Sequence, residues 1–140
     1  MIAGAAVAGV TFALVLVVIG IHYEALSLIT TLCRRLPLGR PRVGIAVVAA
    51  AFAHIVEATV FGIGIHGLVV ADLAAVAGAT GFRDHIYFSF ATYSSLGYGD
   101  LVPLGALRLL AGVEAVTGLV LIAWTASFTY YEMQRYWRDA

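Results

Sequence analysis

The stretch SSLGYGD, at residues 94–100, combines two hydroxyls, two glycines, a tyrosine and an acid within a very apolar chain. Gly97 and Gly99 permit backbone angles that other residues resist, so successive carbonyls of this stretch can turn toward one side. Rings of such carbonyl oxygens, contributed by several chains, can replace the hydration shell of a cation. Ser95 could add a ring of hydroxyls at one end. The pattern predicts ion coordination by backbone oxygens, with no catalytic residue.

Four ionisable residues fall inside apolar segments, where charge is costly and commonly functional: His54, Glu57, His66 and Glu114. One interpretation is structural, with Glu57 or Glu114 hydrogen-bonded between helices behind the 94–100 stretch. A second is that His54 or His66 titrates near neutral pH and biases opening. A third is metal binding or proton relay by His54, Glu57 and His66. This third interpretation is weakened by the position of His66. It lies nine residues after Glu57, about two and a half helical turns, and therefore on roughly the opposite face of the helix.

The chain that positions these residues has 140 residues, of which 62% are hydrophobic and 11% charged. Its mean hydropathy is +0.98. A soluble domain needs more polar surface, so we predict an integral membrane protein in contact with lipids. The net charge of zero argues against a nucleic-acid partner, which requires a basic surface. The single Cys33 excludes an internal disulfide and cannot alone build a metal site.

The apolar segments predict an all-α membrane protein with three transmembrane helices. They cover about residues 2–21 (continuing as helix to about 32), 43–70 and 104–130, each long enough to cross a bilayer. The aromatic stretch at 86–94 is too short to cross and is predicted to be a re-entrant helix. Residues 71–85 before it are expected to form a loose external connection. His22 and Glu24, near the inner end of the first segment, are expected to anchor it at the interface.

The arginines predict the orientation of the chain. Arg34, Arg35, Arg40 and Arg42 surround a proline-rich loop, and two more arginines follow the last segment. Both regions are expected on the cytoplasmic side, which places the N-terminus and the 94–100 stretch outside. The short loops and the absence of lysine favour a bacterial inner membrane.

The residues YFSFATYSSLGYGDLVP resemble the pore region of the potassium channel family, whose signature is a threonine and a valine followed by Gly-Tyr-Gly-Asp. The resemblance spans about residues 86–103 and continues loosely through the last helix. Serine and leucine here replace the threonine and valine of the signature. The resemblance implies a selectivity filter formed by Ser95, Leu96, Gly97, Tyr98 and Gly99, in which the carbonyls of the first four residues coordinate K⁺.

The resemblance also implies roles for the residues around the filter. Asp100 is expected at its outer mouth, and Thr92 lies on the pore helix where the family commonly has a threonine. Ser94 is expected to support the filter. Tyr87 either braces it by a hydrogen bond to Asp100 or lies at the membrane interface. The carboxyl end of the pore helix, with about half a negative charge, would favour a cation in a central cavity.

The last segment is expected to line the pore. It contains Gly112 and Gly118. In the potassium channel family a glycine midway along this helix often acts as a gating hinge, and Gly118 lies at about the matching distance from the filter. The alternative is that these small residues simply allow close helix packing.

Together these observations predict a potassium-selective channel that conducts passively and is not an enzyme. One pore region per chain cannot enclose an axis, so a homotetramer is expected. Residues 1–42 would form a peripheral helix and loop, and residues 43–140 the pore module. No cofactor is expected besides K⁺. The alternatives are a non-selective cation channel, a non-conducting accessory subunit, and a proton- or metal-coupled transporter using His54, Glu57 and His66.

Overall fold

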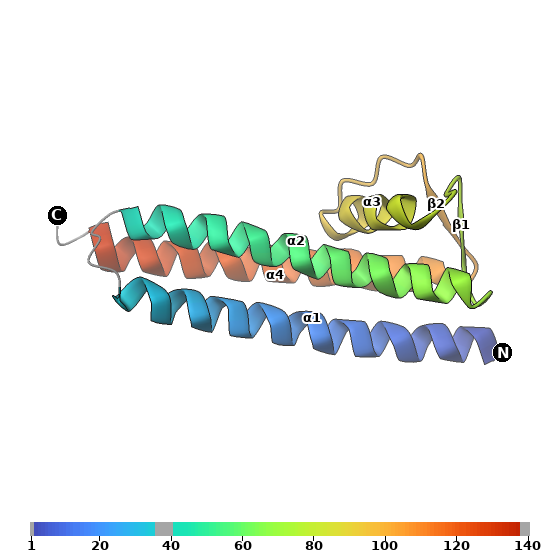
Figure 1. Cartoon of the computed structure of the whole chain (residues 1–140), viewed down its shortest axis with the longest axis horizontal. Helices are drawn as coiled ribbons and strands as arrows, with labels where there is room; N and C mark the ends of the chain where they lie inside the picture. Colours follow the sequence, from blue (N-terminus) through green and yellow to red (C-terminus); the bar gives the residue numbers. More distant parts are fainter. Residues whose placement is uncertain (1, 36–40, 138–140) are drawn as a thin grey trace.

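Three long helices lie side by side along one axis in the computed structural model, which describes residues 2–35 and 41–137 (Figure 1). They are α1 (Ile2–Arg35), α2 (Pro41–Val70) and α4 (Leu107–Trp137). All three are long and apolar enough to cross a membrane. The prediction of an all-α membrane protein with three spanning helices is therefore confirmed. The middle of the predicted arginine loop, residues 36–40, and the last three residues lie outside the described part of the chain.

The fourth helix, α3 (Phe82–Tyr93), packs against α2 and α4 near one end of the bundle (Figure 1). It has 12 residues, about 18 Å of helix, which is well short of the ~30 Å core of a bilayer. It begins four residues earlier than predicted, at Phe82 instead of Ile86. The carboxylate of Asp84 explains the early start, because it accepts hydrogen bonds from the Thr80 backbone N–H (2.6 Å) and hydroxyl (2.8 Å). These bonds lower the pKa of Asp84.

The connection before α3 is more ordered than the loose loop predicted. Strand β1 (Ala75–Ala77) pairs antiparallel with β2 (Val102–Leu104), with Val76 opposite Pro103. Because the two strands flank the stretch from α3 to residue 101, their pairing brings the two ends of that stretch together. Helix α4 begins after β2, at Leu107. Three-residue strands are too short to show an alternating pattern, and their partners lie far apart in the sequence, which is why the sequence did not reveal them.

Glycines allow the helices to approach closely at two levels of the bundle. A Cβ at Gly62 of α2 would lie 3.0 Å from the Ile86 Cα of α3, and one at Gly64 would lie 2.6 Å from the Leu14 side chain of α1. Close approach at small residues is the usual way that membrane helices associate. Helix α2 is therefore held against α1 on one side and α3 on the other.

Candidate functional site

The segment that follows α3 has a backbone of alternating handedness. Ser94 has φ −78°, whereas Ser95, Gly97 and Gly99 have φ of 57°, 53° and 80°. Leu96 and Tyr98, between them, are not among the positive-φ residues. Such alternation turns successive peptide units the same way, so that N–H groups face one side and carbonyls the other. The two glycines stand at two of the three left-handed positions, as their conformational freedom predicts.

Backbone hydrogen bonds tie this segment to the end of α3. The N–H of Ser94 donates to the Phe90 carbonyl (3.2 Å), that of Ser95 to Thr92 (2.9 Å), and that of Gly97 to Ala91 (3.1 Å). Within residues 2–35 and 41–137, none of the backbone hydrogen bonds outside regular helices and strands ends on a carbonyl of residues 95–99. The N–H groups of Ser95 and Gly97 are thus engaged, while the carbonyls of residues 95–99 are available to a ligand.

The left-handed backbone at Ser95 gives a steric reason why this position holds serine and not the threonine of the potassium channel signature. A β-branched side chain is strongly disfavoured at positive φ, whereas serine pays a smaller steric cost. Next to it, the Ser94 hydroxyl donates to the Phe90 carbonyl at 2.7 Å, which fixes the last turn of α3. Thr92 contributes through its backbone carbonyl, and its side chain is half-buried.

Tyr87 connects α3 to the far end of the segment. A hydrogen bond to Asp100 raises the pKa of Tyr87, in line with the bracing role considered for it. Its ring also stacks on that of Tyr98, with centroids 6.5 Å apart and planes 9° from parallel. Despite these contacts all residues from Ser94 to Asp100 are exposed, with Leu96 at 57% and Tyr98 at 67%.

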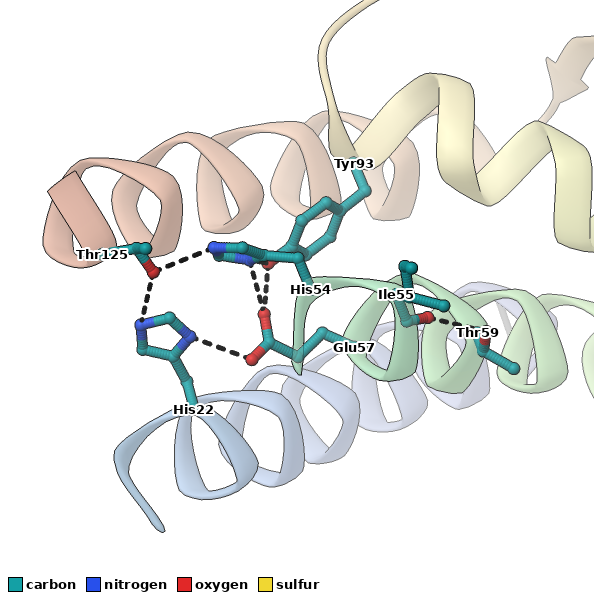
Figure 2. Close-up of polar contacts among 7 residues, drawn as sticks. All are labelled: His22, His54, Ile55, Glu57, Thr59, Tyr93 and Thr125. Atoms are coloured by element: carbon teal, nitrogen blue, oxygen red, sulfur yellow. Dashed lines mark hydrogen bonds and ion pairs between the residues drawn. The ribbon is translucent and has the colours of Figure 1, made fainter. Parts of the chain in front are cut away.

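A second group of polar side chains lies buried or half-buried among the helices, at the level where α3 ends (Figure 2). At its centre is Glu57 of α2, which is fully buried. Nδ1 of His22, from α1, lies 2.9 Å from Glu57 Oε1, and Nδ1 of His54 lies 3.0 Å from Glu57 Oε2. The expectation that His22 anchors the interface is wrong, because its side chain is fully buried against Glu57.

Two hydroxyls complete this group (Figure 2). Tyr93, the last residue of α3, donates to Glu57 Oε2, and its hydroxyl lies 2.8 Å from His54 Nδ1. Thr125 Oγ1 of α4 lies 2.9 Å from His54 Nε2 and 3.5 Å from His22 Nε2. All four helices therefore contribute a side chain, and the group connects α1 to the residue directly before the segment 94–99.

Glu114 of α4 forms a separate polar contact behind α3. The Ser89 hydroxyl of α3 lies within hydrogen-bonding distance of Glu114 Oε1 and 2.6 Å from the Ala58 carbonyl of α2. Glu114 and Ser89 are both fully buried. The interpretation of Glu114 as a tie between helices accords with this geometry, since one hydroxyl bridges three helices.

His66 does not contact Glu57 or His54, and the helical spacing had predicted this separation. Its Nδ1 instead lies 3.1 Å from Nδ1 of His85 at the start of α3, and its ring meets the edge of Phe82. For this bond to form, one imidazole donates and the other accepts, so at least the accepting ring is neutral. The transporter trio of His54, Glu57 and His66 is therefore not assembled.

Acid should weaken the anchoring of α3 through this histidine pair. Burial and the neighbouring His66 lower the pKa of His85, against a smaller opposing effect of Asp84. The unfolded chain then binds more protons than the folded one, so stability falls as the pH drops below about 6.5, the ordinary histidine value. We expect the melting temperature to fall in this range, and to fall less in His85→Gln. An identical pH profile for both proteins would contradict this role.

Gly118 lies where α4 crosses the end of α3. A Cβ at this position would lie 2.0 Å from the Tyr93 carbonyl oxygen and 2.9 Å from its carbon. At Gly112, six residues earlier, a Cβ would meet nothing within 4 Å. Of the two interpretations of Gly118, close packing therefore has a direct structural basis.

Sequence reasoning overlooked four members of the buried polar contacts: His22, Ser89, Tyr93 and Thr125. Ser89 and Thr125 carry small hydroxyls of a kind that membrane helices often bond to their own backbone. His22 had a usable signal, because an ionisable residue within a long apolar helix is a functional suspect by default.

Comparison with known proteins places the chain among channels. Residues 58–134, just over half of the chain, match a family model described as "Ion channel". The inward rectifier potassium channel Kirbac3.1 of Paramagnetospirillum magnetotacticum is 35% identical over 69 residues. The match covers 49% of this chain and 23% of that protein, so the chain spans less than a quarter of the relative's length. No solved structure gives a significant match.

Proposed function

The chain belongs to the ion channel family, and from this premise we propose that four copies form a passive, potassium-selective pore. The carbonyl oxygens of Ser95, Leu96, Gly97 and Tyr98 would coordinate dehydrated K⁺. The observation that carries the proposal is the alternating backbone of residues 94–99, whose N–H groups at Ser95 and Gly97 bond back to α3. This leaves a row of carbonyls of the kind that replaces an ion's hydration shell.

The exposure of this segment supports the assembly. Irregular backbone at membrane depth is tolerated only where protein covers it or water fills a cavity. A single chain leaves residues 94–100 exposed, including the large side chains of Leu96 and Tyr98. Four copies around an axis would cover these side chains with neighbouring subunits and leave the carbonyls facing a water-filled path. The carboxyl ends of four α3 helices would add negative potential below it.

Selectivity for potassium is supported by the Gly-Tyr-Gly-Asp sequence and by the potassium channel named above as a relative. The orientation is proposed from the arginines: Arg34, Arg35, Arg42 and Arg135 lie near the end of the bundle opposite to α3 (Figure 1). That end would face the cytoplasm of a bacterial inner membrane. The N-terminus and the outer mouth of the pore would then share the external side.

Ion flux into liposomes tests the proposal. Purified protein should carry K⁺ at least ~10-fold faster than Na⁺, equivalent to ~1.4 kcal/mol of discrimination, and barium should block it. Gly97→Ala should abolish the flux, because a Cβ at φ 53° costs about 1–2 kcal/mol in each subunit. Gly67→Ala in α2, where a Cβ meets nothing within 4 Å, is the matched control and should conduct normally.

Each alternative gives a different result in this assay. Equal K⁺ and Na⁺ fluxes would indicate a non-selective cation channel, and no flux from the chain alone would indicate an accessory subunit. Either result would overturn the proposal.

A further inference from the structure

We propose that His22, His54 and Glu57 form a binding site for a divalent transition-metal ion of the zinc type, buried within the helix bundle. This inference goes beyond the proposed ion conduction and does not depend on it. Imidazole nitrogens suit zinc-type ions, whereas K⁺ would be held by carbonyl oxygens. Two histidines and one glutamate are also a donor set found in zinc enzymes, where three protein ligands leave a fourth position to water.

The distances between donor atoms are close to those of a metal site. One ligand atom from each of the three residues lies within 4.8 Å of the other two. Nδ1 of His22 is 2.9 Å from Glu57 Oε1, and Nδ1 of His54 is 3.0 Å from Glu57 Oε2. Around a tetrahedral ion with bonds of about 2.0–2.1 Å, neighbouring donors lie about 3.3 Å apart. The two distances from Glu57 to the histidines are thus a few tenths of an ångström shorter than the spacing around such an ion.

Counting hydrogens shows why the metal-free group, with Glu57 ionised and both histidines neutral, is incompletely satisfied. When both Nδ1 atoms carry a hydrogen and donate to Glu57, both Nε2 atoms become acceptors. These two acceptors face one hydroxyl, Thr125 Oγ1, at 2.9 Å from His54 and 3.5 Å from His22. A hydroxyl has a single hydrogen, so one of the two nitrogens is left without a donor.

A metal ion resolves this shortage. When the ion is bound by both Nδ1 atoms, both Nε2 atoms carry a hydrogen. The two lone pairs of Thr125 Oγ1 can accept both of these hydrogen bonds. Ligating histidines usually donate their other N–H to such a partner, and ligating carboxylates are hydrogen-bonded in turn. Tyr93 already supplies that last bond, because it donates to Glu57 Oε2.

The surroundings also favour a cation. Glu57 is fully buried, and a buried carboxylate requires a compensating positive charge. Helix α3 ends at Tyr93, beside the site, and the carboxyl end of a helix carries about half a negative charge. Because His22 lies on α1 and Glu57 on α2, a bound ion would link these two helices beside Tyr93, the last residue of α3.

Metal content of the full-length protein in detergent tests the proposal. The protein is stripped with chelator, incubated with Zn²⁺, desalted and analysed by elemental mass spectrometry, and its melting temperature is recorded. Wild type should retain about one zinc per chain and melt at a higher temperature with zinc. His22→Gln should lose both effects. His66→Gln, which removes a histidine of the same bundle outside the site, should retain both.

Several outcomes would overturn the proposal. One is a wild-type protein that retains no zinc, in which case a proton on one histidine completes the group instead. Another is retention by His22→Gln together with loss in His66→Gln, which would place the ion at the His66–His85 pair. If His22→Gln does not fold, the test uses the wild-type protein with Co²⁺ in place of Zn²⁺. Visible absorption bands typical of tetrahedral Co²⁺ would support the site, together with a Co²⁺ affinity that Thr125→Val weakens about 10–100-fold. A spectrum typical of octahedral Co²⁺ would overturn it.

Discussion

Gly118→Ala should lower the melting temperature and abolish conduction. The new methyl group would lie 2.0 Å from the Tyr93 carbonyl oxygen, a distance at which no side chain can remain, and the obstacle is backbone. Either α4 or the end of α3 must move. Overpacking of this kind costs about 1–3 kcal/mol or more. Because Ser94 follows Tyr93 directly, a displaced α3 end also displaces the proposed filter. Thermal unfolding and liposome flux measure the two effects.

Gly112→Ala is the matched control, and the effect on stability should have the opposite sign. Its Cβ meets nothing within 4 Å, and alanine is the better helix former by about 1 kcal/mol. A hinge at Gly118 predicts something different, namely lost opening in a protein that is as stable as wild type or more stable. An unchanged or raised melting temperature in Gly118→Ala would therefore favour the hinge over close packing.

Glu57→Ala should be the most destabilising single change in the buried polar group. Glu57 accepts from Tyr93 and lies within 3.0 Å of a nitrogen of both His22 and His54. Its removal leaves the buried Tyr93 and His22 and the half-buried His54 without their shared partner, at about 1–3 kcal/mol for each buried group. A loss of several kcal/mol is expected, together with loosening of α1 from α2. Thermal or denaturant unfolding in detergent measures it.

Glu24→Ala provides the comparison, because Glu24 is an exposed acid two residues from His22 on α1. Its replacement should change stability by no more than about 0.5 kcal/mol. The melting temperature of Glu57→Gln should lie between those of Glu57→Ala and Glu24→Ala, since the amide retains one acceptor oxygen. Equal melting temperatures for Glu57→Ala and Glu24→Ala would show that the buried group does not hold the helices together.

The parts of this fold with strong local signals could be predicted from the sequence. The three spans follow from long apolar runs, and the short α3 from an aromatic run below spanning length. Gly97 and Gly99 predicted an irregular backbone, and both adopt positive φ. The helical spacing between Glu57 and His66 also correctly predicted that these two side chains do not meet.

The rest depends on contacts between distant residues, which one sequence does not display. His22 is 35 residues from Glu57, and Thr125 is 71 from His54. The position of His22 within a long apolar helix marks it as a functional suspect, but nothing local identifies its partners. The pairing of β1 with β2 was missed for the same reason. Gly118 was singled out correctly, but only the approach of the Tyr93 carbonyl distinguishes a packing site from a hinge.

The most direct test of the central claim is an experimental structure of the assembled protein soaked with Tl⁺, a heavy-atom substitute for K⁺. The account predicts a four-fold axis and a column of anomalous peaks along it, between the carbonyl planes of residues 95–98. An assembly without a four-fold axis, or a four-fold axis with no ions at those carbonyls, would contradict it.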